Sequence, residues 1–231
     1  MIQLIDQPFK CTHCNKSFMR QRTLISHMCE GRRRAMQQGE KRVQAGLMVY
    51  NRFFQLTQNA KKPKTYDEFC NTSYYNAFVK FGSFINNVKP LYPEKFVDYV
   101  IKSGVKLDHW CRDELYETYL YEMIKVEPVD NAIERSIKTF MEWGDKHNTP
   151  FEDYFNLINL NQAVQDILNG KISPWIILNS AAGQTMLNKM NDEQLNMIAP
   201  ALEIQFWVRK FKTVPADVAL VREICKEVGI K

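Results

Sequence analysis

Long apolar stretches are missing from this chain of 231 residues. No run approaches the roughly 18 consecutive apolar residues that a membrane-spanning helix needs. The opening residues, Met-Ile-Gln-Leu-Ile-Asp, also lack the basic segment and the apolar core of a secretion signal. We therefore expect a cytoplasmic protein without a membrane partner, whose six cysteines are thiols or metal ligands rather than disulfides.

Signatures of catalysis are also missing. The chain has only four histidines and nine glycines, with no His-Glu-x-x-His motif, no glycine-rich phosphate loop and no Gly-x-Ser-x-Gly elbow. His109 and Cys111 could form a nucleophilic pair if acids joined them in one cleft. Because Cys111 falls on the apolar stripe of an expected helix, a buried thiol is the simpler interpretation. We expect no enzyme.

The composition is that of a globular protein, with 45% hydrophobic and 25% charged residues. It excludes a wholly disordered chain, a collagen and a coiled-coil rod. Positive charge is concentrated at one end: residues 1–62 contain 12 Lys or Arg and 3 Asp or Glu, a net charge of +9. The remainder contains 19 and 23, a net charge of −4. A basic segment of this kind attracts nucleic acid, although it could also be a solvated helix face with no partner.

Cysteine and histidine spacing near the N-terminus indicates a metal site. Cys11 and Cys14 are two residues apart, the spacing at which a tight turn directs two thiolates at one ion. Phe18, Leu24 and His27 follow in an order that resembles the Cys-Cys-His-His zinc finger, a hairpin followed by a helix. The aromatic and aliphatic residues are too few to hold about 20 residues folded without a metal.

The fourth ligand departs from that family. Gly31 and the following arginines occupy the places of its second histidine, so Cys29 is the nearby substitute. Spacing of i, i+2 does not put His27 and Cys29 on one face of a helix. We therefore expect the helix to end at His27, with Glu30-Gly31 suiting such an ending. The predicted site is a structural Zn²⁺ held by Cys11, Cys14, His27 and Cys29, and His13 is disfavoured because its backbone belongs to the turn.

The predicted fold class is mainly α, with three segments. A ββα zinc finger covers residues 8–31, a long basic amphipathic helix covers 32–62, and a multi-helix all-α body covers 65–231. Period-two alternation is nearly absent from the body. Helix-start signals recur instead, at Asp108, Asp130, Ser173-Pro174, Asn191 or Asp192, and Pro215.

Docking in the manner of DNA-reading fingers assigns base-facing roles to Arg20, Thr23 and Ser26, the positions −1, 3 and 6 of the helix, with Arg22 beside them. One finger covers only about 3 bp, so further contacts are needed. The basic segment could supply phosphate contacts through Arg32, Arg33, Arg34, Lys41, Arg42 and Arg52.

The whole chain resembles a group of uncharacterised zinc-finger proteins of T-even-like bacteriophages. The resemblance is carried by His-x-Cys-Glu followed by Arg-Arg-Arg, by Ser173-Pro174-Trp175 and by Trp207-Val208-Arg209-Lys210-Phe211. It implies that His-x-Cys is the metal signature of that group, and it supplies no activity.

Two functions remain open from the sequence. The first is a phage accessory protein in the host cytoplasm that binds DNA, or RNA, through the finger and the basic helix, and a protein through the body. The second is an assembly or adaptor protein whose finger stabilises the fold or contacts protein. The oligomeric state is open in both.

Overall fold

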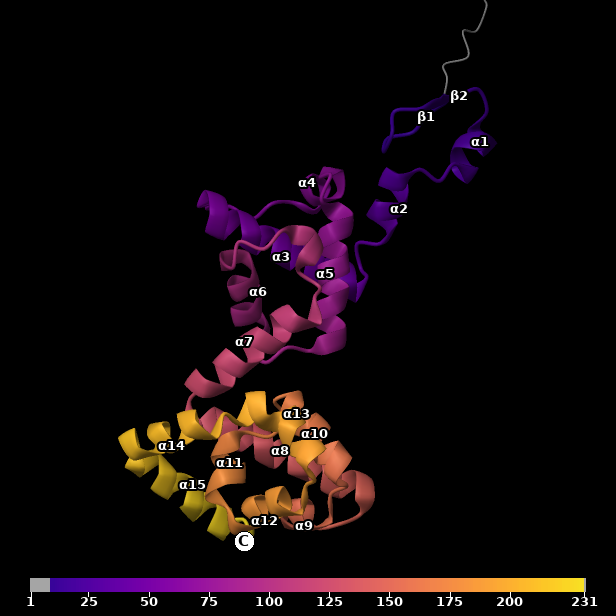
Figure 1. Cartoon of the computed structure of the whole chain (residues 1–231). Coiled ribbons are helices and arrows are strands. Elements are labelled where there is room, and N and C mark those ends of the chain that lie inside the picture. Colours follow the sequence, from indigo (N-terminus) through magenta and orange to yellow (C-terminus); the bar gives the residue numbers. More distant parts are fainter. Residues whose placement is uncertain (1–8, 231) are drawn as a thin grey trace, which may run out of the picture. The chain divides into compact units, whose positions relative to one another are not determined.

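The computed structural model describes residues 9–230 and is mainly helical, with one two-stranded sheet near the N-terminal end (Figure 1). This confirms the predicted fold class. The opening segment and residue 8 of the predicted finger lie outside the described residues. Across residues 9–230, no helix combines the length and the apolar character that crossing a bilayer requires.

The first element is the predicted ββα unit. Strands β1 (Phe9–Lys10) and β2 (Ser17–Phe18) pair antiparallel, with Phe9 opposite Phe18, and helix α1 (Gln21–Ser26) follows. The turn between the strands contains Asn15 at φ 59°, a left-handed conformation that asparagine tolerates. We call residues 9–29 the finger.

The expected single helix over 32–62 is wrong. The segment forms two helices, α2 (Glu30–Met36) and α3 (Lys41–Gln58), separated by a turn that contains Gly39. Glu30-Gly31 begins α2 rather than ending the finger helix, because the side chain of Cys29 caps α2 by accepting the Arg32 backbone N–H. After the turn, the carbonyl of Glu40 accepts bonds from Val43 and Gln44 and starts α3.

The contact pattern divides the chain into two compact units, residues 1–116 and 117–231, with the boundary inside α7 (Asp113–Val126). A body that begins at residue 65 therefore does not describe the structure. The apolar stripe of α3 explains the difference, because it buries Val43, Val49 and Tyr50 against the helices that follow. The apolar face of α3 thus belongs to the core of the first unit.

The helical part of the first unit consists of α3 with α4 (Tyr66–Asn71), α5 (Tyr75–Val88), α6 (Pro93–Lys102) and the 3₁₀ turn η1 (Leu107–His109). Helices α3 and α5 cross at two glycines. A Cβ on Gly82 would lie 2.3 Å from the Arg42 carbonyl oxygen and 2.6 Å from the Gly46 nitrogen. No side chain fits in that space, so glycine permits the close crossing. Aromatic rings fill the adjacent core around Phe78 and Trp110.

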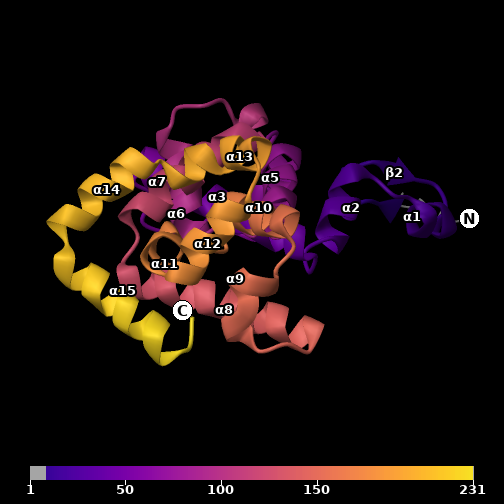
Figure 2. The same ribbon diagram turned by 60° about the horizontal axis from the view of Figure 1, so that its bottom comes forward.

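The second unit is a separate helical bundle. Helix α11 contacts α8, α12 and α15 near its centre (Figure 2). Trp175 and Trp207 are buried there with their ring centroids 5.7 Å apart. Its elements after α7 are α8 (Val129–His147), η2 (Phe151–Asp153), α9 (Tyr154–Leu157), α10 (Leu160–Leu168), α11 (Pro174–Asn179), α12 (Ala181–Lys189), α13 (Asp192–Leu202), α14 (Ile204–Thr213) and α15 (Pro215–Glu227).

Most helix starts match the sequence signals. Ser173 caps α11 by accepting the Trp175 N–H, with Pro174 at the first helical position, and Asn191 forms a capping box with Gln194 at α13. The helix expected from Asp108 is present, but its predicted start is wrong, since α7 begins only at Asp113. The buried indole of Trp110 donates to the Val105 carbonyl and holds the preceding residues in a 3₁₀ turn.

Candidate metal centre

The four predicted metal ligands converge in the structure. One ligand atom each from Cys11, Cys14, His27 and Cys29 lies within 4.8 Å of all the others. The Sγ atoms of Cys11 and Cys29 are 3.9 Å apart, and Cys14 Sγ lies 3.2 Å from His27 Nε2. A tetrahedral ion with sulfur ligands at about 2.3 Å has ligand–ligand edges of about 3.8 Å. The cluster therefore fits a single metal ion.

The path of the chain explains how ligands two residues apart can face one point. His27 is the C-terminal cap of α1, whereas Cys29 is the N-terminal cap of α2. Both have extended backbone, which turns the chain between the two helices. The expected end of α1 at His27 is confirmed, but Cys29 reaches the site from the start of a new helix.

Arg32 supports two of the ligands from outside the cluster. Its backbone N–H donates to Cys29 Sγ at 3.4 Å. Its guanidinium donates to the carbonyls of His27 at 2.8 Å, Ile25 at 2.9 Å and Leu24 at 3.3 Å. These carbonyls lie in the last turn and cap of α1, where Leu24 also accepts the His27 backbone N–H, so Arg32 closes the end of the finger helix and ties it to α2.

Gly31 allows α2 to approach the cysteine turn. A Cβ at this position would lie 3.0 Å from the carbonyl oxygen of His13 and 3.2 Å from its Cβ. The His13 side chain is exposed and is not part of the converging cluster. The sequence predicts a helix stop at Gly31 and a phosphate contact at Arg32. Neither the approach of Gly31 to the cysteine turn nor the bonds from Arg32 to carbonyls can be seen in spacing along the chain.

The two cysteines of the turn differ in their ionisation. Backbone N–H donation, first from His13, lowers the pKa of Cys11. The Lys16 backbone lowers the pKa of Cys14, but burial and the neighbouring thiols outweigh this and raise it overall. Adjacent thiolates repel each other, so a cation at the centre would favour the doubly ionised state that metal binding requires.

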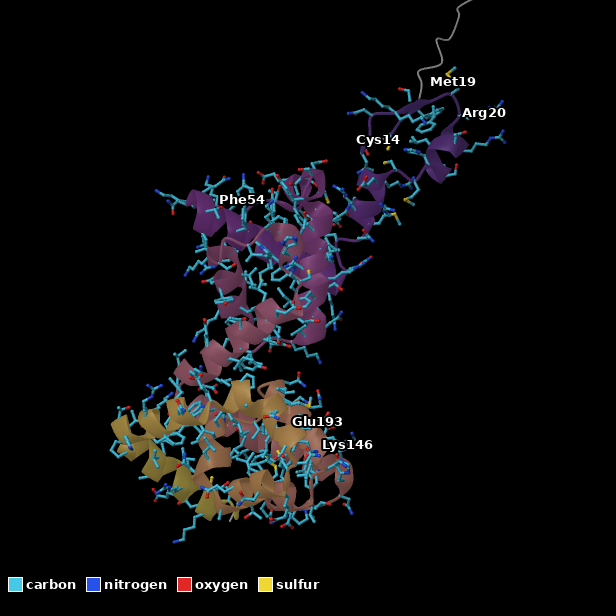
Figure 3. All side chains as sticks on the ribbon, viewed as in Figure 1. Cys14, Met19, Arg20, Phe54, Lys146 and Glu193 are labelled. Atoms are coloured by element: carbon cyan, nitrogen blue, oxygen red, sulfur yellow. The ribbon has the colours of Figure 1, made fainter. Side chains whose placement is uncertain are left out.

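The predicted base-facing residues Arg20, Arg22, Thr23 and Ser26 are all exposed. The guanidinium groups of Arg20 and Arg22 form no ion pair or hydrogen bond in the described range 9–230, although the Arg20 carbonyl accepts the backbone N–H groups of Thr23 and Leu24. Ser26 donates its hydroxyl to the Thr23 carbonyl at 3.3 Å. Figure 3 shows Arg20 beside the start of α1, with Cys14 nearer to α2.

Three of the cations predicted to contact phosphate are engaged inside the protein. Arg32 binds the end of α1. Arg34 donates to the carbonyls of Cys70 at 2.6 Å and Thr72 at 3.3 Å, pairs with Glu30, and lies over the ring of Tyr75.

Arg52 donates to both carboxylate oxygens of Asp98, each at 2.5 Å. This pairing raises the pKa of Arg52 and lowers that of Asp98. Guanidinium groups held in this way contribute to the fold, and their partners cannot be recognised from spacing because they lie up to 46 residues away along the chain.

The remaining predicted cations face solvent. Arg33 and Lys41 are exposed and unpaired within residues 9–230, while Arg42 pairs with the exposed Glu40 at 2.7 Å. These three, with the two finger arginines, are the predicted cations that stay accessible to a polyanion.

His109 lines a cavity of about 460 Å³ together with Arg112 and Glu114, and Cys111 is not among its lining residues. No hydrogen bond is found between the His109 and Cys111 side chains, and burial raises the pKa of the Cys111 thiol. Within residues 9–230, the finger holds the only converging group of His, Cys, Asp or Glu ligand atoms. The expectation that the chain is not an enzyme stays a prediction.

Comparison with known proteins adds no relative. No family model, curated protein or solved structure matches this chain. The resemblance to phage proteins therefore stays a prediction from the sequence, and function has to be argued from the site.

Proposed function

We propose that this protein binds nucleic acid, most readily duplex DNA, through a finger folded around one Zn²⁺. The observation that supports this is the convergence of three sulfurs and one imidazole in a ββα unit whose helix leaves Arg20 and Arg22 exposed and unpaired within residues 9–230. Thiolate and imidazole in a tetrahedral set suit zinc. With all four positions filled by protein, the ion would be structural.

Charge on the finger favours a polyanion as the partner. Lys10, Lys16, Arg20 and Arg22 are exposed, and residues 9–29 contain no Asp or Glu. Arg33 and Lys41 extend this positive surface along α2 and the start of α3. Release of counterions from the nucleic acid would make the affinity fall with salt, by roughly 0.9 logarithmic units per phosphate contact for each tenfold increase in salt.

The test uses the zinc-loaded full chain and a fluorescent duplex, with a single strand and an RNA of the same sequence as competitors. We expect binding at low salt that weakens as salt rises. The variant Arg20→Ala/Arg22→Ala should weaken duplex binding at least about tenfold, since each charge-assisted contact contributes about 1.5–3 kcal/mol. The matched control is Lys189→Ala/Arg222→Ala, which removes the same charge from exposed positions of the second unit.

Variants of Arg32 and Arg34 are unsuitable for this test. Both guanidiniums hold carbonyls of the fold, so their loss would weaken binding by unfolding the site. Equal affinity of the Arg20→Ala/Arg22→Ala protein and its control would reject the proposed interface.

An adaptor function is the second candidate, because the finger also exposes apolar side chains. Met19 is 76% exposed, Ile25 64% and Met28 56%. Apolar residues grouped on a small unit are typical of protein contacts. Under this alternative the finger binds a protein, and the wild-type chain shows no affinity for duplex DNA or RNA at low salt. The variant Ile25→Ser, rather than the arginine variant, then abolishes capture of the protein partner. For both candidate functions we propose that the protein is encoded by a bacteriophage.

A further inference from the structure

A cavity of about 540 Å³ lies in the first unit, away from the metal cluster. It is bounded by α3, by the turn over residues 60–63 and by the start of α6. Its volume is within the range of about 300–1,000 Å³ that small-molecule sites occupy. None of the finger residues lines it.

The walls of this cavity are fixed by contacts that do not depend on a ligand. The Lys64 backbone N–H donates to Asn51 Oδ1 at 2.5 Å, and Asn51 Nδ2 donates back to the Lys64 carbonyl at 3.4 Å. These bonds hold the turn against α3. The pairing of Arg52 with Asp98 ties α3 to α6. A ligand would therefore meet a preformed site and lose little affinity to ordering of the protein.

The polar groups that remain accessible divide between two walls. Lys61 and Lys62 on the turn are exposed and form no ion pair with another residue of the described range. Glu94 on α6 likewise has no ion pair there. Arg52 also lines the cavity, with Nε and Nη2 each donating one bond to Asp98 and Nη1 donating one to Gln55 Oε1 at 2.8 Å, so one N–H on each Nη is left for an anion. The wall between them includes Met48, which is 43% exposed.

We infer that this cavity binds a nucleoside monophosphate unit whose base carries an exocyclic amino group. The phosphate would lie on Lys61 and Lys62, the ring on the Met48 thioether, and the amino group would donate to Glu94. Two adjacent ammonium groups attract an anion, and a phosphate can accept hydrogen bonds from both. The Glu94 carboxylate on α6 repels a second anionic group, which disfavours acidic peptides and dicarboxylates, and it can accept a hydrogen bond from an N–H donor.

This inference goes beyond the proposed function and needs neither the metal nor the finger. The nucleotide unit has two possible sources, a free mononucleotide or one residue of a single strand. Both sources present the same phosphate, sugar and base to the cavity. A competition experiment therefore distinguishes them.

The test measures binding of cytidine and uridine 5′-monophosphates to the full chain by calorimetry. The two differ where cytosine presents an amino donor and uracil a carbonyl acceptor. We expect cytidine monophosphate to bind roughly tenfold more tightly, and Glu94→Gln to reduce that preference. Lys61→Ala/Lys62→Ala should weaken both nucleotides at least about tenfold. The control Lys80→Ala/Lys106→Ala removes equal charge from exposed positions outside the cavity.

Two further arms identify the source and separate the two proposals. A short oligo(dC) that competes better than the mononucleotide, through the same lysines, identifies a strand as the source. Arg20→Ala/Arg22→Ala should leave mononucleotide binding unchanged, so loss of duplex binding with intact nucleotide binding rejects only the finger interface. Absence of nucleotide binding by wild-type protein at millimolar concentration, or equal binding by the Lys61/Lys62 variant and its control, overturns the inference.

Discussion

The finger and the helical parts of this protein are stabilised in different ways. Within residues 9–36 only Cys11 is buried, at 3% exposure, and Phe9 is 38% exposed. The helical part of the first unit, by contrast, buries Phe69 and Phe81 completely. Apolar burial contributes about 25 cal/mol per Å², so a finger without a buried apolar side chain gains little from it. The helices are therefore stabilised by apolar packing, whereas the finger has little of it and would rely on the proposed metal ion.

The same contrast appears in the use of arginine. On the finger, Arg20 and Arg22 remain exposed and unpaired within residues 9–230. On the helices, Arg34 and Arg52 bind carbonyls and a carboxylate of the fold. The clustered arginines of the sequence are therefore of two kinds, those that face solvent and those that bind groups of the fold. Only the contacts in the structure distinguish the two kinds.

Removal of the metal should have the largest effect, and it should act on the finger alone. Cys14→Ser or a chelator should unfold the finger, because structural zinc contributes about 10–16 kcal/mol of apparent binding energy to comparable units. The helical units should remain folded. Native mass spectrometry should find one zinc per wild-type chain and less in the variant, and amide NMR should show loss of finger signals only.

Two substitutions serve as controls for the metal assignment. Cys111→Ser and His13→Ala lie outside the converging cluster and should keep the ion. Full zinc content in Cys14→Ser would contradict the site, and zinc loss in His13→Ala would show that the ligand set is wrong.

Gly82→Ala should destabilise the helical part of the first unit and leave the finger intact. Its Cβ would lie 2.3 Å from the Arg42 carbonyl oxygen, a backbone atom that cannot move without shifting α3. We expect a loss of about 1–3 kcal/mol or more in unfolding free energy of the first unit, with zinc content unchanged. Gly39→Ala is the matched control, since a Cβ there meets nothing within 4 Å. Chemical denaturation monitored by circular dichroism should separate the two variants.

Arg33 and Arg34 are adjacent and should give crossed phenotypes. Arg34→Ala removes bonds to the Cys70 and Thr72 carbonyls and should lower the unfolding free energy by about 2 kcal/mol. Arg33→Ala should change it by no more than about 0.5 kcal/mol, yet weaken binding to DNA. Denaturation and salt-dependent binding of both variants measure this. Similar stability of the two proteins would contradict the internal role of Arg34.

Acidification should have the smallest effect on the helical part. Hydrogen bonding to Arg52 lowers the pKa of Asp98 from 3.8, so the pair stabilises the fold above that pH and is lost as the pH falls through the lowered value. Because the pair is partly exposed, Asp98→Asn should cost no more than about 1 kcal/mol at neutral pH. Metal release should come first, since protons compete for the thiolates. A helical part that unfolds before the ion leaves would contradict this order.

Local signals account for what the sequence predicted correctly. Cys11, Cys14, His27 and Cys29 lie within 19 residues, so their convergence needs only one turn and one short helix. The caps at Ser173 and Asn191 are set by the cap residue and its next three neighbours. Such interactions depend on spacing along the chain, which a sequence shows directly.

Local spacing was thus enough to predict which Cys and His residues converge, the helical class and the capping of several helices. Tertiary structure alone decided that the basic segment breaks at Gly39, that α3 joins the core of the first unit, and that Arg34 and Arg52 are internal. The physical reason is range. A guanidinium beside a carbonyl 36 residues away, or a glycine beneath another helix, gains its role from a neighbour that spacing in the chain does not reveal.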